Sequence, residues 1–312
     1  MDLAREIADL VTQIPEGRVA TFLDVAEALG DPKAAPAVFR ILRDRPAEGA
    51  HRIVRATGEP AFPGALAVLR REGLAISRGR VADLDGARFA DFHGPRTLAR
   101  LREEQLRLAR RVEPKDRGGP ADRIAGFDLS YDGDRAVVAG VVTTPDGKVL
   151  ESRALRVRVD FPYVPGYLAY RESPAIERCF SRLDPSPDVL MIDGHGVLHP
   201  ARLGVASFAG VRLDRPTIGV AKSLLVGEAG PLPDDAGGTA EVRVDGEVLG
   251  AGLRSGRSRR MVYVSVGHAI SLVTAIQITK ALCRTRIPEP LRQAHILATD
   301  EKRKWKKKRE EV

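Results

Sequence analysis

The sequence predicts an α/β protein of two domains: a helical N-terminal domain with a helix-turn-helix, and a larger domain with a mixed sheet and flanking helices. Its 312 residues are about twice the roughly 150 expected for one domain. Apolar residues recur at helical spacing up to residue 112, and beyond a connector rich in proline, glycine and charge they alternate as in strands. Strands interleaved with helices favour a layered α/β architecture. We expect domains at 1–92 and 93–295, followed by a basic tail at 296–312.

The N-terminal helices are predicted by their periodicity and caps. Apolar residues share one face of a first helix within residues 3–14. Thr21 followed by Asp24 indicates a capping box for a helix that ends at Gly30. Pro32 suits the first turn of the next helix. Two short helices joined by a tight turn predict a helix-turn-helix.

Strands are predicted in the second domain where apolar or alternating runs are bounded by turn residues. The expected strands are 127–131, 136–142, 149–159, 189–192 and 217–220, and Asp245-Gly246 indicates a hairpin turn. Helices are expected over 95–112, 174–180 and 272–283.

The charge of the chain favours a polyanionic partner. Lys and Arg number 50 against 42 Asp and Glu, a net charge of +8. Residues 1–95 hold 13 basic and 14 acidic side chains, so the excess belongs to the rest of the chain. No run reaches the ~18 apolar residues of a membrane helix, and the charged N-terminus is unlike a signal peptide. With two cysteines a disulfide scaffold is excluded, so we expect an intracellular protein that binds no membrane.

Three carboxylates of the second domain are candidates for a metal site. Asp128 lies within an apolar strand, and Asp193 ends another. Glu172 precedes Ser173-Pro174, which we predict as the N-cap and first residue of a helix. Acids on neighbouring buried strands repel each other unless a cation neutralises them, and Mg²⁺ prefers oxygen ligands. The alternative for each acid alone is a helix cap or strand end in water.

Further polar residues follow the same strands. His195 and His199 come shortly after Asp193, Lys222 follows a strand end, and His268 ends another segment. Each histidine is also compatible with an ordinary core or surface position, and a single lysine is usually solvated.

A series of motifs in the second domain resembles the endonuclease V family, in the family's order and spacing over roughly residues 96–295. The motifs are Phe161-Pro-Tyr-Val-Pro-Gly166, Arg171-Glu-Ser-Pro174, Val189-Leu-Met-Ile-Asp-Gly-His-Gly196, His199-Pro200, Gly204-Val-Ala-Ser207, Pro216-Thr-Ile-Gly-Val-Ala-Lys222 and Ser265-Val-Gly-His268. The resemblance implies a ribonuclease H-like sheet and a nuclease that uses Mg²⁺, with Mn²⁺ able to substitute. It implies cleavage of the second phosphodiester 3′ to deaminated bases, chiefly inosine.

The resemblance also implies roles for individual residues. Asp128 and Asp193 would bind the metal, Glu172 completes the acidic set, and Lys222 meets the charge that develops on the phosphate. His268 lies beside the metal site and His199 is a supporting polar residue. The implied wedge that fills the gap of an extruded base is Pro162, Tyr163, Val164 and Pro165, and the implied base pocket is formed by main-chain groups of Gly166, Leu168, Gly204 and Val205. The chain departs from the family at Phe208, where a histidine is frequent, and this places a peripheral contact in doubt.

Residues 1–90 resemble the winged-helix-like C-terminal domain of alkylguanine-DNA alkyltransferases. The resemblance rests on segments 14–22, 30–35, 51–54 and 69–73. Ala50 occupies the position of the nucleophilic cysteine, so alkyl transfer is excluded. We expect a DNA-docking module that uses Arg40, Arg43, Arg45 and Arg52. A structural or protein-contact role and the readout of alkylated bases are the alternatives.

Two basic segments remain. Residues 302–309 surround Trp305 and are compatible with phosphate binding, with Trp305 stacked on a base, or with a solvated helix end. Residues 253–260 are expected to contact the DNA backbone. We expect a prokaryotic DNA repair endonuclease, cytoplasmic and associated with the nucleoid, whose partner is DNA with deaminated, or also alkylated, bases. The alternatives are a non-catalytic protein that flags lesions and an inosine-specific ribonuclease. The sequence indicates no oligomeric state.

Overall fold

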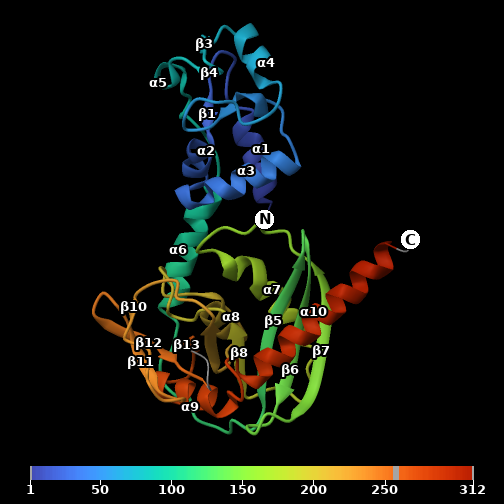
Figure 1. Ribbon diagram of the computed structural model, residues 1–312, viewed down its shortest axis with the longest axis vertical. Helices are drawn as coiled ribbons and strands as arrows, with labels where there is room; N and C mark the ends of the chain where they lie inside the picture. The colour runs from blue at the N-terminus through green and yellow to red at the C-terminus, as the bar shows by residue number, and fades with distance from the viewer. Residues whose placement is uncertain (1, 256–259, 311–312) are drawn as a thin grey trace. The chain divides into compact units, whose positions relative to one another are not determined.

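The computed structural model describes residues 2–255 and 260–310, and the chain divides into two compact units (Figure 1). The first comprises residues 1–103 with 161–165, and the second comprises residues 104–160 with 166–312. The boundary falls within helix α6 (Thr97–Ala109). The central part of the predicted basic loop, 256–259, lies outside the described residues. No helix in the described part of the chain combines the length and apolarity needed to cross a membrane.

The first unit contains the predicted helix-turn-helix. Thr21 and Asp24 form the predicted capping box, in which the Thr21 hydroxyl accepts from the Asp24 amide and the Thr21 amide donates to the Asp24 carboxylate. The helices are α1 (Leu3–Val11), α2 (Phe22–Leu29), α3 (Ala35–Asp44), α4 (Ala65–Arg71) and α5 (Leu84–Ala87), with 3-10 turns η1 (Pro32–Ala34) and η2 (Ala50–Arg52). Short strands β1 (Ala20–Thr21) and β2 (Ile53–Val54) pair in parallel, and β3 (Ile76–Ser77) and β4 (Arg80–Val81) pair antiparallel.

The second unit is built on a mixed sheet, which has nine strands in the described part of the chain. The strands are β5 (Ile124–Asp132), β6 (Arg135–Thr143), β7 (Val149–Arg158), β8 (Val189–Asp193), β9 (Thr217–Ala221), β10 (Glu228–Ala229), β11 (Thr239–Val244), β12 (Glu247–Leu253) and β13 (Val262–His268). Their order is β10-β11-β12-β13-β9-β8-β5-β6-β7, with β5, β8 and β9 parallel and the other pairs antiparallel. The mixed sheet of the predicted fold class is therefore confirmed.

Helices cover both faces of this sheet (Figure 1). Helices α7 (Leu168–Phe180) and α8 (Val205–Leu213) pack on one face over a core that includes Phe127 and Ile192. Helices α9 (Leu272–Leu282) and α10 (Glu289–Glu310) pack on the other, over a core that includes Met191 and Val220. The alternation of strand side chains between the two faces thus buries both.

Two sequence details are decided by the backbone. Asp245 and Gly246 both have positive φ, as a two-residue hairpin turn between twisted strands requires, so the predicted hairpin is confirmed. In contrast, helix α7 begins at Leu168 and contains Pro174 in its interior. The prediction that Ser173 caps this helix is therefore wrong, because buried Ala169 adds an earlier turn that packs in the core.

Candidate active site

The two predicted metal ligands meet because β5 and β8 are adjacent parallel strands. Phe127 is paired with Ile192, so Asp128 and Asp193, one residue further along each strand, lie at the same level. Phe127 and Ile192 both point into the core beneath α7 and α8. Alternation therefore directs both carboxylates toward the opposite face, which α10 covers.

Asp128 is held by a residue that the sequence did not reveal. Its Oδ2 atom lies 2.6 Å from Nδ1 of His295 on α10, and its Oδ1 atom accepts a hydrogen bond of 2.9 Å from the Leu129 amide. α10 approaches closely at Gly126, where a Cβ atom would lie 2.3 Å from the Pro290 carbonyl carbon. A glycine two residues before Asp128 was the available signal that another backbone passes there.

Asp193 is paired with Lys222. The Lys222 ammonium forms an ion pair with Asp193 Oδ2, as expected for a residue that follows the end of β9, the next parallel strand. The prediction that the Lys222 side chain faces the acidic site is therefore confirmed.

Glu172 reaches the same group of acids from α7. The side chain is buried, and its Oε1 atom accepts a 2.7 Å hydrogen bond from the Tyr131 hydroxyl at the end of β5. Burial raises the pKa of Glu172 to about 7, aided by the negative charges of Asp128 and Asp193 and opposed by the Tyr131 hydrogen bond. Glu172 is thus poised to hold a proton near neutral pH.

Burial also raises the pKa of Asp128, and the nearby charge of Asp193 adds to this effect, while His295 and Lys222 oppose it. A buried carboxylate whose ionisation is disfavoured by a second carboxylate beside it is part of a donor set that a divalent cation stabilises. Among residues 2–255 and 260–310, no three His, Cys, Asp or Glu side chains are arranged as a metal-binding group. Asp128 and Asp193 alone still fit Mg²⁺, because this ion usually takes one or two protein carboxylates and completes its shell with water and phosphate.

His268 lies elsewhere, and the prediction that it stands beside the acids is wrong. β13 runs antiparallel to β9, so His268 is paired with Thr217 at the start of β9, whereas Lys222 follows its end.

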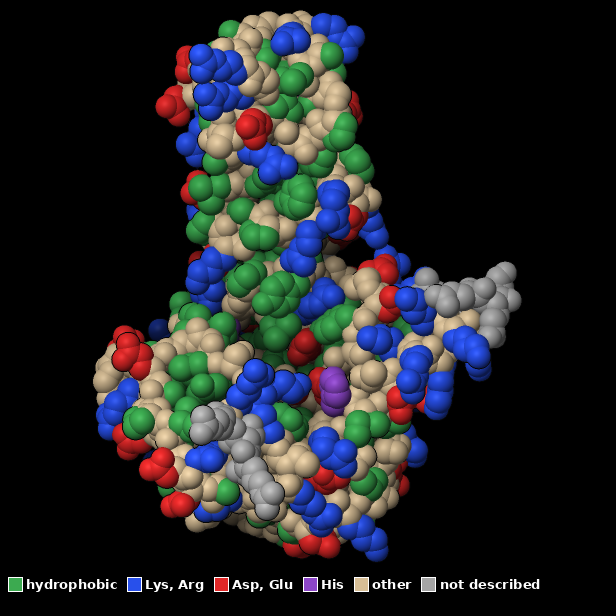
Figure 2. Space-filling model, viewed as in Figure 1, with side chains coloured by type: hydrophobic (Ala, Val, Ile, Leu, Met, Phe, Trp, Pro, Cys, Tyr) green, Lys and Arg blue, Asp and Glu red, His purple; other side chains and the backbone are tan. Residues whose placement is uncertain are grey.

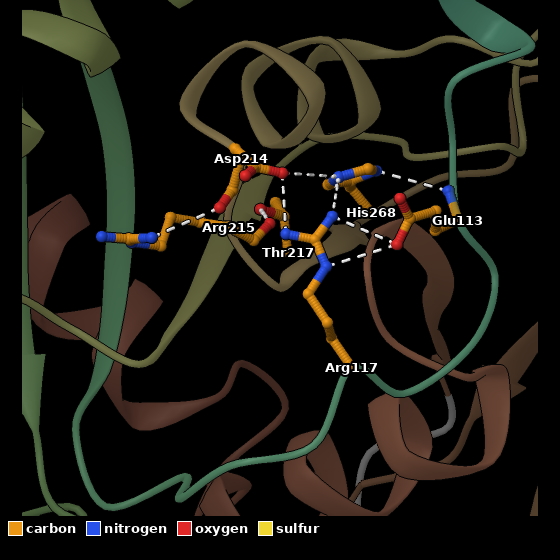
Figure 3. Close-up of polar contacts among 6 residues, drawn as sticks. All are labelled: Glu113, Arg117, Asp214, Arg215, Thr217 and His268. Carbon is orange, nitrogen blue, oxygen red and sulfur yellow. Dashed lines mark hydrogen bonds and ion pairs between the residues drawn. The ribbon is translucent and has the colours of Figure 1, made fainter.

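His268 Nδ1 accepts from the Glu113 amide at 3.3 Å, and its Nε2 lies 3.1 Å from Arg117, which also pairs with Asp214 (Figure 3). Burial and the Arg117 charge lower the pKa of His268. This histidine fastens residues 113–117 to the sheet at the end of β13, away from the acids.

The other two histidines lie in the loop after β8. His199 is buried and its Nδ1 accepts a 3.1 Å hydrogen bond from the Ala201 amide, a contact compatible with the predicted supporting role. Burial lowers the pKa of His195, and its Nδ1 atom is buried without a hydrogen-bond partner among the described residues.

The predicted wedge and base pocket lie on loops and helix starts. Tyr163 is about half exposed, at 49%. Gly166, with φ of 84°, precedes α7, whose first residue is Leu168. Gly204 precedes Val205 at the start of α8 and packs so closely on the loop after β8 that a Cβ atom would lie 2.2 Å from the His195 oxygen. The binding roles of these residues stay predictions.

In the first unit, three of the four predicted arginines are exposed, and the fourth is not. Arg40 and Arg43 lie on α3 and Arg45 ends it, with Arg43 paired to Asp44. Arg52 instead donates to the Glu72 carboxylate and to the Ile14 carbonyl, and its side chain is only 14% exposed. This burial contradicts the prediction that Arg52 contacts DNA.

Ala50 begins the 3-10 turn η2 and is buried. Beside it, His51 Nε2 lies 2.7 Å from Glu72 Oε1. This histidine–glutamate pair therefore lies next to the Ala50 methyl group, which cannot act as a nucleophile.

Two protein families match this chain. Residues 106–296 match the family described as Endonuclease V, and residues 2–77 match the family described as 6-O-methylguanine DNA methyltransferase, DNA binding domain. The first match alone covers more than half of the chain.

Individual relatives agree with the first match. Endonuclease V of Roseiflexus sp. (strain RS-1) is 45% identical over 207 residues, which are 66% of this chain and 93% of that protein. The catalytic domain of human endonuclease V superposes with a TM-score of 0.64 at 38% identity, covering 68% of this chain and 98% of that chain. Endonuclease V of Ciona intestinalis, solved with a 24mer DNA containing an inosine followed by a ribo-adenosine, gives a TM-score of 0.60 at 29% identity and covers 66% of this chain and 98% of that chain. The chain therefore belongs to the endonuclease V family of nucleases, and an alkyltransferase-type DNA-binding domain without the nucleophilic cysteine precedes its nuclease domain.

Proposed function

We propose that this protein is a Mg²⁺-dependent DNA repair endonuclease that nicks the second phosphodiester 3′ to inosine. The observation that carries the proposal is the placement of Asp128 and Asp193 at one level of adjacent parallel strands. Lys222 is paired with Asp193, and His295 contacts Asp128. The inosine-containing DNA bound by the Ciona relative supports the choice of substrate.

The residues divide the chemistry among themselves. Mg²⁺ held by Asp128 and Asp193 supplies an activated water and stabilises charge on the phosphate oxygens when it is bound. His295 orients the Asp128 carboxylate, and Lys222 offers positive charge to the phosphate as negative charge develops on it. Glu172, hydrogen-bonded to Tyr131, accepts or holds a proton at its carboxylate. Tyr163 fills the gap that the extruded base leaves, and extrusion itself costs a few kcal/mol.

The first unit docks on DNA in this proposal, and it transfers no alkyl group. Exposed arginines on α3 supply the phosphate contacts. We place the domain boundaries at 1–92 and 93–295, and the protein in the cytoplasm with the chromosomal DNA.

The test is to incubate the protein with Mg²⁺ or Mn²⁺ and duplexes that contain one inosine, alkylguanine, uracil or ordinary base, and to map the cut to the nucleotide. We expect a nick one nucleotide beyond inosine. Asp193→Asn should lower the single-turnover rate by at least about 10²–10³-fold, the size of effect seen when a group that stabilises transition-state charge is removed. Asp245→Asn is the matched control, because this exposed turn residue lies outside the site and asparagine accepts its backbone conformation.

An intact inosine duplex that is bound but left whole with either ion would instead support the lesion-binding alternative. Cleavage of inosine-containing RNA in preference to DNA would support the ribonuclease alternative.

A further inference from the structure

The last turns of α10 carry a basic segment that the endonuclease V match, which ends at residue 296, does not include. This segment is attached to the sheet. Trp305 packs with Val137 and Ala154 in a small apolar cluster, and the guanidinium groups of Arg135 and Arg156 lie 5.8 and 5.4 Å from its ring centre. Trp305 is therefore an anchor for the helix and not a free stacking platform, whereas residues 303, 304 and 306–308 around it are exposed, as the interpretation of a solvated helix end expects.

Because the anchor fixes the rotation of α10, it also fixes where the cations point. Lys302, Arg303, Lys306 and Lys307 line one hollow of about 440 Å³, whose other walls are Tyr131 and Asp132 at the end of β5. Positions 302 and 306 are one helical turn apart, as are 303 and 307, so the four side chains form a stripe on the helix. Lys and Arg side chains dominate the surface of this part of α10 (Figure 2).

The hollow and the group of acids are linked by one side chain, Tyr131. Tyr131, which forms its wall, donates its hydroxyl to Glu172 at 2.7 Å. A polyanion whose phosphate lies at the carboxylates is thus one side chain away from four cations. Asp132 is the acid in the lining of this hollow, and Asp300 is paired with Arg303.

We propose that the stripe of Lys302, Arg303, Lys306 and Lys307 is a binding surface for the phosphate backbone of substrate DNA, on the strand that leaves the active site past Tyr131. The inference rests on the proposed function for the identity of the substrate. The stripe would help to position the DNA whatever its base sequence, because lysine and arginine contacts to phosphates do not read the bases.

Two charge-matched double variants test this surface. Lys302→Ala/Lys306→Ala removes two cations of the stripe, whereas Lys304→Ala/Lys308→Ala removes two from the other side of the same helix, where Glu301 is their neighbour. Alanine favours helix at all four positions, of which three are exposed and Lys302 is half-buried, so both variants should fold. The measurement is the affinity for an inosine duplex, with Ca²⁺ in place of Mg²⁺ to prevent cleavage, between 50 and 200 mM salt.

The stripe variant should lower the salt slope of the association constant by about 1.8, which makes the loss of affinity across this salt range about tenfold smaller, while the control keeps the wild-type slope. Equal slopes for wild type and stripe variant, or equal drops for both variants, would overturn the inference. A drop seen only with RNA would overturn the assignment to DNA. If no inosine DNA is cut but the slope still separates the two variants, the proposed function fails and the surface stands.

Discussion

At the scale of the residue, two histidines at different ends of the central strands separate catalysis from architecture. His295 is 58% exposed and bound to Asp128, whereas His268 is buried against Arg117 and the connector. His295→Ala should lower the single-turnover rate of cleavage by about 10–100-fold, the usual cost of removing a group that orients a metal ligand.

His268→Ala serves as the comparison. It should leave the cleavage rate of the folded protein within a few-fold and speed hydrogen exchange in residues 113–117, because it removes the partner of the Glu113 amide. A larger rate loss for His268→Ala than for His295→Ala would reverse the assignment.

Glu72 in the first unit offers a test by pH. Hydrogen bonds from Arg52, and then from His51, lower its pKa to about 2 against the opposing effect of burial. The lowered pKa means that this carboxylate stabilises the fold at pH values above its ordinary pKa of 4.5, and that the stabilisation is lost as pH falls toward 2.

Glu72→Gln should therefore lower the free energy of local opening in residues 2–90 by about 1.5–3 kcal/mol at pH 6, and by much less near pH 2. Hydrogen exchange of peptides from the full chain, corrected for intrinsic rates, measures this difference. Glu59→Gln, at an exposed site, should change neither value. A constant difference across this pH range would show that the charge of Glu72 is not what stabilises the fold.

At the scale of the element, α10 depends on Trp305 to remain helical beyond the apolar contacts of Ala294 and Ala298. Trp305→Ala should ease local opening of residues 300–310 by about 1–3 kcal/mol, because it removes a partly buried aromatic ring. Hydrogen exchange of this segment should become about 10–100-fold faster, while Trp305→Phe should keep most of the protection. Unchanged protection in the alanine variant would mean that the helix persists without this anchor.

The elements also show what sequence alone can predict. Caps and turn residues identified α2 and the Asp245-Gly246 hairpin, because these signals act within a few residues of chain. The motifs identified Asp128 and Asp193. They could not place His268, because the direction of β13 in the sheet is decided by pairing far along the chain. They also missed His295, since a single histidine on a long polar helix carries no pattern until the helix is packed on β5.

At the scale of the whole molecule, charge is divided between the two units. Residues 1–95 are close to neutral, and the net positive charge lies in the remainder of the chain. DNA docking by the first unit must then come from a local group of cations rather than from its overall field.

Arg40→Ala/Arg43→Ala/Arg45→Ala should weaken binding to every duplex alike and lower the salt slope by about 2–3. Arg70→Ala/Arg71→Ala/Arg80→Ala removes the same charge from other exposed positions of this unit and should have little effect. If the two triple variants bind alike, the first unit has a structural or protein-contact role instead.

One continuous helix bears both His295 and the stripe at 302–307. Lys302 lies seven positions after His295, a rise of about 10 Å, so the distance from the phosphate at the active site to the phosphates bound by the stripe is set by the helix. The helix also sets the direction in which the cations point. One residue inserted between His295 and Lys302 would rotate the stripe by about 100° around the helix axis, so the catalytic residues would stay in place while the stripe would point away from the hollow.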